Sequence, residues 1–280
     1  MFRFFRQLRL RILSGKPREQ GEKAHTRGKA PSPAGRYLLY AFGEILLVVL
    51  GILIALQVDN WNEDRSKRRQ AAEFRAQLRE GVITDMENIQ TRMRFFEKAI
   101  SYGYQAEAEL SSPKAQGEEA RWQFLVQVFH ASQIWNFNQA TATYNEVQNP
   151  EMLGYLGPPK LLNALQRYYN EWPLQLSVLT GGTQAYRDFV RSIVPMSLQE
   201  YMWGACYDID VLDIQSFVPC SAPPGEQEAI ERAYREISGD VAFRRLLTQR
   251  LSTLYTRNVV YRNILLEAET LLELLKTDGL

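Results

Sequence analysis

The stretch "GEILLVVLGILIALQVDNWNED", residues 43–64, is apolar apart from Glu44 as far as Gln57, and then becomes polar around a single tryptophan. As a helix, residues 37–58 would span about 33 Å, enough for a hydrocarbon core of about 30 Å. The Leu, Ile and Val side chains favour insertion by more than the one carboxylate opposes it. We therefore predict a transmembrane helix over residues 37–58, the alternative being the buried core helix of a soluble protein.

The charges on either side of this span predict its orientation. Lys and Arg greatly outnumber Asp and Glu in residues 1–36, whereas both signs are mixed after residue 58. Close to the span the basic residues are nearly balanced, so the longer basic tail decides under the positive-inside rule. We expect a bacterial inner-membrane protein with a cytoplasmic N-terminus and a periplasmic domain, residues 59–280. No small-residue cleavage site ends the stretch, which favours an uncleaved signal anchor.

The N-terminal segment, residues 1–36, combines two patterns. In "MFRFFRQLRLRIL", Phe and Leu alternate with Arg, which predicts a short basic amphipathic helix on an anionic membrane surface. A disordered basic tail is the alternative. Residues 14–35 are polar with Gly and Pro throughout, as is typical of a linker.

Apolar residues recur every three or four positions after the span, which is the spacing of a helix. They are Leu78, Val82, Met86, Ile89, Met93, Phe96 and Ile100. No Pro or Gly interrupts the chain between Gly51 and Gly81, so we expect the membrane helix to continue outward. Further helical segments are predicted near 118–134, 140–147, 159–172 and 174–192, and one β-like stretch at 207–218. The predicted fold class is all-α: one transmembrane helix continuing into an extramembrane helical bundle.

The C-terminal segment carries the most regular pattern, with alternating steps of four and three. Its positions are Leu247, Leu251, Leu254, Asn258, Tyr261, Leu265, Ala268, Leu272 and Leu275. This is a heptad seam, and its one polar position, Asn258, is of the kind that fixes register or partner number. We expect the seam to pack against the helix that follows the membrane span. An intermolecular coiled coil is the alternative.

One face of the predicted membrane helix holds the candidate partner-binding residues. The face comprises Tyr40, Glu44, Val48, Gly51 and Ala55, followed by Asn60 and Trp61 at the opposite interface. Gly51 and Ala55 form a small-xxx-small pair, which lets a second helix approach closely. Because intramembrane ionisable groups usually face protein, we predict that Glu44 bonds to a partner helix. Snorkelling of Glu44 to the cytoplasmic interface is the alternative.

Cys206 and Cys220 are the two cysteines of the chain. In an oxidising compartment they would close a loop of about 15 residues, worth roughly 3 kcal/mol in the chain-entropy model. We predict this disulfide on the condition that the domain is exported, with two unpaired thiols as the alternative. Two cysteines make no zinc site by themselves.

The span "RYLLYAFGEILLVVLGILIALQVDNWNED", residues 36–64, closely resembles the opening of a family of uncharacterised bacterial single-span membrane proteins, abundant in Bacteroidetes and their relatives. "FFRQLRLRIL" and "TYNEVQNPEMLGYLGPPKLLNALQRYY" (143–169) are similar to further segments of that family. This chain departs from it in the longer Pro/Gly linker and in the cysteine-containing segment 203–225. The resemblance implies a domain of unknown function with one membrane helix, and it supplies no catalytic residues.

The sequence offers no motif for catalysis, a cofactor or a metal. HExxH, GxSxG, a Walker-type glycine loop and a dinucleotide fingerprint are all missing from the sequence. The basic residues are concentrated in the tail, where a membrane surface explains them, so nucleic acid is not expected as a partner. We therefore predict a protein that is not an enzyme, takes no cofactor, and has as partners the lipid bilayer and other membrane-protein subunits.

The favoured function is that of an accessory or scaffolding subunit, which docks on a larger membrane complex through its membrane helix and periplasmic domain. One alternative is an extracytoplasmic sensor or ligand-binding module that signals through a partner, and another is a self-associating coiled coil. A concave pocket with convergent polar groups would favour the sensor. A flat apolar patch and an ordered N-terminal tail would favour the subunit.

Overall fold

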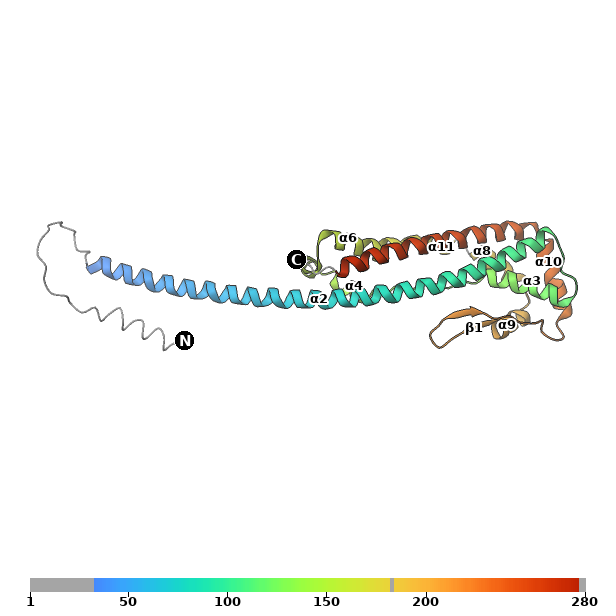
Figure 1. Ribbon diagram of the computed structural model, residues 1–280, viewed down its shortest axis with the longest axis horizontal. Coiled ribbons are helices and arrows are strands. Elements are labelled where there is room, and N and C mark those ends of the chain that lie inside the picture. Colours follow the sequence, from blue (N-terminus) through green and yellow to red (C-terminus); the bar gives the residue numbers. More distant parts are fainter. Residues whose placement is uncertain (1–32, 182–183, 277–280) are drawn as a thin grey trace, which may run out of the picture. The chain divides into compact units, whose positions relative to one another are not determined.

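The apolar stretch lies in one helix, α2, which runs from Pro33 to Ser111 in the computed structural model (Figure 1). The structure describes residues 33–181 and 184–276, apart from the side chains of residues 33–40 and 180–181. Within these residues one helix is long and apolar enough to cross a membrane. Further helices follow it, so the predicted all-α class is confirmed. The helix predicted in the N-terminal tail lies outside the described residues.

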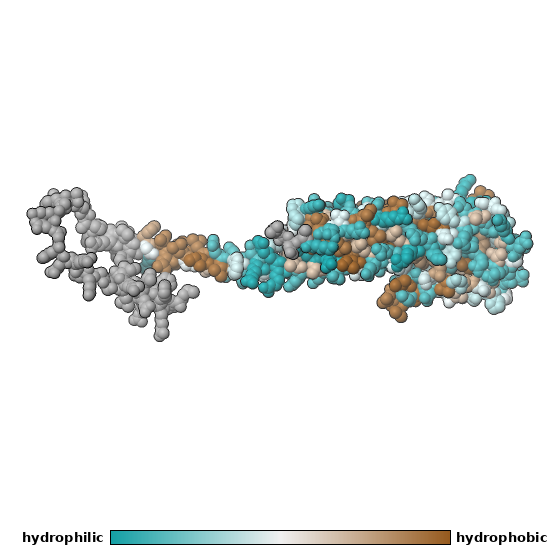
Figure 2. All heavy atoms as spheres, viewed as in Figure 1, coloured by the Kyte–Doolittle hydropathy of each residue, from teal (hydrophilic) through white to brown (hydrophobic). Residues whose placement is uncertain are grey.

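The chain divides into two units, residues 1–61 and residues 62–280. In the first unit, every side chain from Phe42 to Trp61 is exposed. Figure 2 shows the apolar residues of this part gathered over the surface of the helix. A continuous surface of Leu, Ile and Val is unfavourable in water, so this segment needs an apolar surrounding.

In the second unit, α2 buries one stripe of side chains that advances by alternating steps of four and three. The stripe comprises Leu78, Val82, Asp85, Ile89, Arg92, Phe96, Ala99, Gly103, Ala106 and Leu110. Such spacing keeps one seam of the helix against its neighbours. Gly103 marks the closest approach, because a Cβ there would lie 2.6 Å from a methyl carbon of Leu251.

The C-terminal helix α11, Val241–Lys276, lies beside α2 and buries a matching stripe (Figure 1). The stripe comprises Phe243, Leu247, Arg250, Leu254, Arg257, Tyr261, Ile264, Ala268, Leu271 and Leu275. Of the other residues predicted in the seam, Leu251 and Asn258 are also buried beside this stripe. Leu265 and Leu272 are half-buried, because the fully buried positions there are the preceding residues, Ile264 and Leu271.

Two hydrophobic clusters form the core of the second unit. The first lies where α3, Glu118–Ala131, meets α8, Gln184–Ile193, α9, Met196–Ala205, and α10, Gln227–Gly239. The second joins the middle of α2 and the later part of α11 to the short helices α4, Ala142–Val147, and α6, Pro159–Gln166. A π-helix, η1 (Arg167–Glu171), and α7, Trp172–Gly181, complete this second region.

Helices were predicted near 140–147 and 159–172 with no helix between them, and this part of the prediction is wrong. The helix α5 occupies Pro150–Leu156. Asn149 caps it, since its side-chain oxygen accepts the Glu151 N–H at 3.0 Å. Pro150 stands at the first helical position, where its missing N–H costs nothing. The same Asn-Pro pair that resembles a break therefore starts a helix.

A small hairpin follows α9, in the stretch predicted as β. Strands β1, Tyr207–Ile209, and β2, Gln215–Phe217, pair antiparallel with Tyr207 opposite Phe217. Asp210 shapes the turn, because its carboxylate accepts N–H groups from Leu212 and Ile214 at 2.8 Å each. The hairpin lies between the two cysteines, which are bonded as a disulfide with Cα atoms 5.1 Å apart.

His130, on α3, lies beneath this hairpin. Its burial leads us to predict that the folded state loses stability in acid. Its ring is fully buried, 4.4 Å from the ring of Phe217, and neither ring nitrogen has a hydrogen-bond partner. Burial, together with the positive charge of Arg191, lowers the pKa of His130 to about 3. The folded state therefore holds a neutral imidazole, whereas the unfolded chain takes up a proton below its ordinary pKa of about 6.5.

The contribution of the neutral His130 ring to the free energy of unfolding is at its maximum above about pH 6.5. It is lost progressively as the pH falls toward 3. Between pH 6.5 and pH 5 we expect the loss to reach about 2 kcal/mol of unfolding free energy. His130→Phe keeps the aromatic packing and should remove that loss, measured by urea unfolding of the detergent-solubilised full chain. His25→Phe, at the other histidine, is the control. If the His130→Phe chain and the unchanged chain lose stability in parallel, the assignment is wrong.

Candidate functional site

The segment that joins α3 to α4, residues 132–141, is not helical, and side chains of α2 bind its backbone. Arg92 donates from Nε to the carbonyl of Asn136 at 2.9 Å. Asp85 accepts the N–H of Ala140 at 2.9 Å. Backbone groups inside a protein need such partners wherever no helix or sheet supplies them. The two polar members of the α2 stripe thus hold this segment in place.

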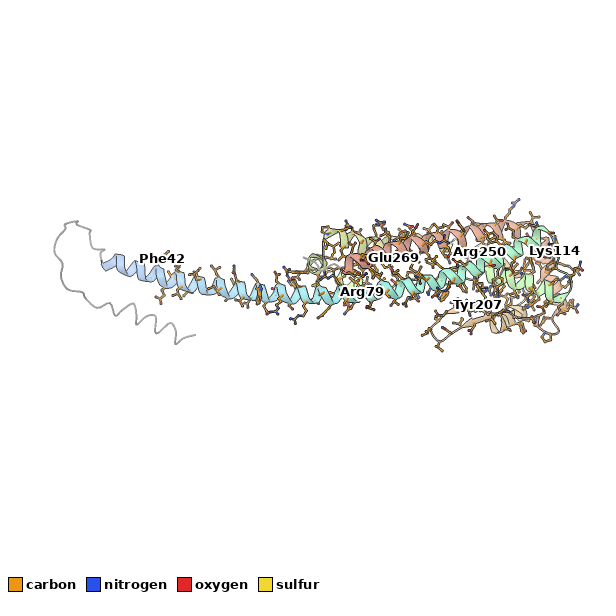
Figure 3. The ribbon with its side chains drawn as sticks, viewed as in Figure 1. Phe42, Arg79, Lys114, Tyr207, Arg250 and Glu269 are labelled. Atoms are coloured by element: carbon orange, nitrogen blue, oxygen red, sulfur yellow. A yellow bond between two sulfur atoms is a disulfide. The ribbon has the colours of Figure 1, made fainter. Side chains whose placement is uncertain are left out.

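Arginines from two other helices bind carbonyls at the end of α3 and at the start of the same segment. Arg250 of α11, labelled in Figure 3, donates from Nε to the Ala131 carbonyl at 2.8 Å and from Nη2 to the Gln133 carbonyl at 2.5 Å. Arg187 of α8 donates to the Ser132 carbonyl at 3.2 Å. The planar guanidinium presents several donors in a fixed geometry, which suits two neighbouring carbonyls.

A cavity of about 920 Å³ lies against this segment. Its other walls come from η1, α7 and α11, with Gln184 at the start of α8. Five aromatic side chains line it, namely Trp135, Phe137, Tyr169, Trp172 and Tyr261. Amide side chains of Asn and Gln make up much of the remaining wall. Cavities of about 300–1,000 Å³ with apolar walls and a few polar groups are typical of small-molecule sites.

Several polar atoms of the lining residues are buried and lack a hydrogen-bond partner. They are Trp135 Nε1, Trp172 Nε1, the Tyr169 hydroxyl oxygen, Gln139 Oε1 and Arg257 Nη2. Leaving one such group unpaired costs about 1–3 kcal/mol. A small side-chain rotation that brought them to a molecule in the cavity would recover part of this cost.

Arg257 is the charged residue among those that line the cavity. Its side chain is 3% exposed, and its guanidinium carbon lies 4.8 Å from the centre of the Phe96 ring. Burial lowers the pKa of Arg257 below its ordinary value, yet a guanidinium stays protonated in proteins. In the part of the chain that the structure describes, Arg257 forms no ion pair.

Two consecutive tyrosines of the π-helix connect the cavity wall to α2. The hydroxyl of Tyr168 donates to Asp85 at 3.1 Å, and its carbonyl accepts from Gln139 at 3.0 Å. Tyr169 lines the cavity and stacks on Tyr144, with ring centres 4.3 Å apart. Burial raises the pKa of the Asp85 carboxyl to about 6, although two hydrogen bonds and the charge of a nearby arginine act to lower it. π-Helical turns often occur at functional sites, and this one places a lining residue.

The predicted partner-binding face of the membrane helix is uncovered within its own unit. Glu44, Val48, Gly51, Ala55, Asn60 and Trp61 are all exposed. A Cβ placed on Gly51 would meet no atom within 4 Å. The side chain of Tyr40 lies outside the described residues. The role of this face stays a prediction.

Most lining residues were not predicted from the sequence. Tyr261 is the one residue of the predicted seam that lines the cavity. Asp85, Arg92 and Arg257 were missed, although each continues the alternating spacing of its helix. Polar residues at seam positions are therefore the signal that would have identified them. No such signal in the sequence identifies Trp172 as a residue that lines the cavity.

Comparison with known proteins bears on the first part of the chain. Neither a curated protein nor a solved structure matches the chain. Residues 44–180 match a family model, so this stretch includes the apolar segment of α2 and the cavity wall from Trp135 to Ser177, but not α11. The matching model is described as "Family of unknown function (DUF6090)", which agrees with the uncharacterised domain that the resemblance implied.

Proposed function

We propose that the protein is a non-catalytic, membrane-anchored module that binds a small molecule in the cavity of its second unit. The observation that carries the proposal is the gathering of unpartnered buried polar atoms on the residues lining one cavity. A concave pocket with convergent polar groups is the feature expected of a sensor or ligand-binding module.

A binding role, rather than catalysis, is supported by the chemistry of the walls. The lining residues include no Asp, Glu, His, Cys or Lys, so the general acids and bases of most enzymes are missing from them. The hydroxyls of Thr141 and Ser177 have no base beside them on the lining. Aromatic rings and amides are groups that recognise a molecule without reacting with it.

Anchoring is supported by the exposed apolar part of α2, which is long enough to cross a bilayer. We place the N-terminus in the cytoplasm and the helical unit in the periplasm of a bacterial inner membrane, because of the basic tail. The Cys206–Cys220 disulfide suits that oxidising compartment. A scaffolding role, with docking through the face around Glu44, remains a prediction. In a ligand-binding module that face would pass the signal to a partner.

The test fills the cavity and asks whether small molecules are still retained. Ser177 lines the cavity and is exposed on α7, so Ser177→Trp should obstruct it without disturbing the core. Gln175→Trp, on the same helix and exposed outside the lining, is the matched control. Full-length proteins in mild detergent would be incubated with a mixture of bacterial metabolites, separated by gel filtration and extracted for mass spectrometry.

We expect metabolites on the unchanged protein and on the Gln175→Trp control, and their loss from Ser177→Trp. An unchanged protein that retains nothing would disprove the proposal. Equal retention by the cavity-filled variant would place binding elsewhere and would equally count against it.

A further inference from the structure

The charge balance of the cavity narrows the kind of molecule that fits it. Arg257 brings one positive charge to the lining, and the lining brings no negative charge. Its like-charged neighbour on α11, Arg250, reinforces the positive potential, since the two arginines interact electrostatically. A buried charge without a counter-ion is unfavourable, so a ligand that supplies one negative charge would be stabilised there.

The nearby carboxylate, that of Asp85, already has other partners. Asp85 accepts hydrogen bonds from the Ala140 N–H and from the Tyr168 hydroxyl, and it balances Arg92, which feels its charge. The electrostatic partner that acts on Arg257 is Tyr261, a neutral phenol. Because Arg257 forms no ion pair among the described residues, a bound acid could supply its counter-charge.

Once rotated toward the cavity, the buried donors of the lining residues would suit a planar acceptor with a single charge. Arg257 Nη2 and the indole N–H groups of Trp135 and Trp172 donate only, and the Tyr169 hydroxyl can donate. A carboxylate accepts several such bonds at once and carries one charge. A phosphate dianion would bring a second negative charge into a lining that has one cation.

The remaining walls suit an apolar body. Trp172 and Phe137 present aromatic surfaces, and Leu176 and Ile264 add aliphatic surface. Flat apolar groups pack well against such rings. The volume of about 920 Å³ leaves room for more than a single ring.

We infer that the cavity binds a small organic acid, with its single carboxylate toward Arg257 and a flat apolar body among the aromatic side chains. This inference rests on the proposed ligand-binding function, and it specifies the chemical class of the ligand.

The experiment compares acids with their uncharged counterparts. A panel of arylalkanoic acids of increasing chain length, each paired with its primary amide, would be titrated by calorimetry into the full-length protein in neutral detergent. Each pair has nearly the same shape and differs in charge. We expect at least one acid to bind about 10- to 100-fold more tightly than its amide, as a charge-assisted hydrogen bond in a buried site would produce.

Substitutions test whether Arg257 causes the tighter binding of the acid. Arg257→Gln should reduce the acid-to-amide ratio to near one, whereas Arg262→Gln, an exposed arginine on the same helix, should leave it unchanged. Ser177→Trp should abolish binding of both compounds. Because Arg257 packs on Phe96, its variant requires a circular dichroism check. The ratio measured on the unchanged protein tests the class whether or not that variant folds.

The outcomes separate the class of ligand from the proposed function. If no acid of the panel binds more tightly than its amide, the inference is overturned, even where metabolites are retained in a Ser177-dependent way and ligand binding itself stands. If an acid is preferred but Arg257→Gln keeps the full preference in a folded protein, the placement of the carboxylate is wrong. If neither metabolites nor panel compounds bind, both proposals fail.

Discussion

Replacing Arg250 with methionine is expected to lower the free energy of unfolding by about 3–5 kcal/mol. The side chain is 1% exposed and donates hydrogen bonds to the carbonyls of Ala131 and Gln133. Methionine fills a similar volume but donates nothing, so two buried carbonyl oxygens lose their partner. The cost then exceeds the net worth of two ordinary hydrogen bonds, because both acceptors stay away from water.

Denaturant unfolding of the detergent-solubilised full chain, followed by far-ultraviolet circular dichroism, measures this loss. Arg245→Met, at an exposed position earlier on the same helix, should change stability by less than about 0.5 kcal/mol. Arg250→Lys should recover only part of the loss, since an ammonium cannot reproduce the two-pronged geometry. A loss below about 1 kcal/mol for Arg250→Met would mean that other contacts, such as that of Arg187, hold the segment.

Loss of the disulfide is expected to have the second-largest effect, about 3 kcal/mol for a loop of this length. The bond joins Cys206 and Cys220, which are 14 positions apart, and Cys206 is fully buried. The segment after the hairpin also anchors α3, because the Cys220 carbonyl accepts from Gln123 at 2.8 Å and from Trp122 at 3.3 Å. Without the bond the unfolded chain gains conformational entropy, and this gain lowers the free energy of unfolding.

The measurement compares unfolding of the unchanged chain, with and without reductant, with unfolding of the Cys206→Ala, Cys220→Ala double variant. Reductant should destabilise the unchanged chain and leave the double variant unaffected. If the double variant is as stable as the oxidised chain, the bond contributes nothing to folding. If reductant has the same effect on both chains, its action lies elsewhere.

How far the sequence predicted the structure is clearest on α11. Leu247, Leu254 and Tyr261 were placed correctly because apolar spacing alone defines them. Between them the prediction chose Leu251 and Asn258, and it passed over Arg250 and Arg257, which occupy the central stripe. Arginine is ordinarily exposed, so its burial depends on partners that sequence spacing does not reveal.

Those partners are distant in the chain, which explains why the cavity could not be predicted. The carbonyls that bind Arg250 are more than a hundred positions earlier, at the end of α3 and at the start of a segment without any periodic pattern. The lining itself comes from stretches around Trp135, Trp172 and Arg257, and from Gln184 of α8. The disulfide differs from these cases, because two cysteines allow a single pairing within the chain.

The number of residues in the π-helix η1 fixes how the side chains after it are rotated relative to those at its start. An α-helix turns by about 100° per residue, so removing one residue from η1 would rotate everything after it by that angle. Tyr168 could then keep its bond to Asp85 only if Trp172 swung away from the cavity. Homologous chains that bind the same molecule should therefore tolerate insertions and deletions in the loops around this turn, while the length of the turn itself stays constant.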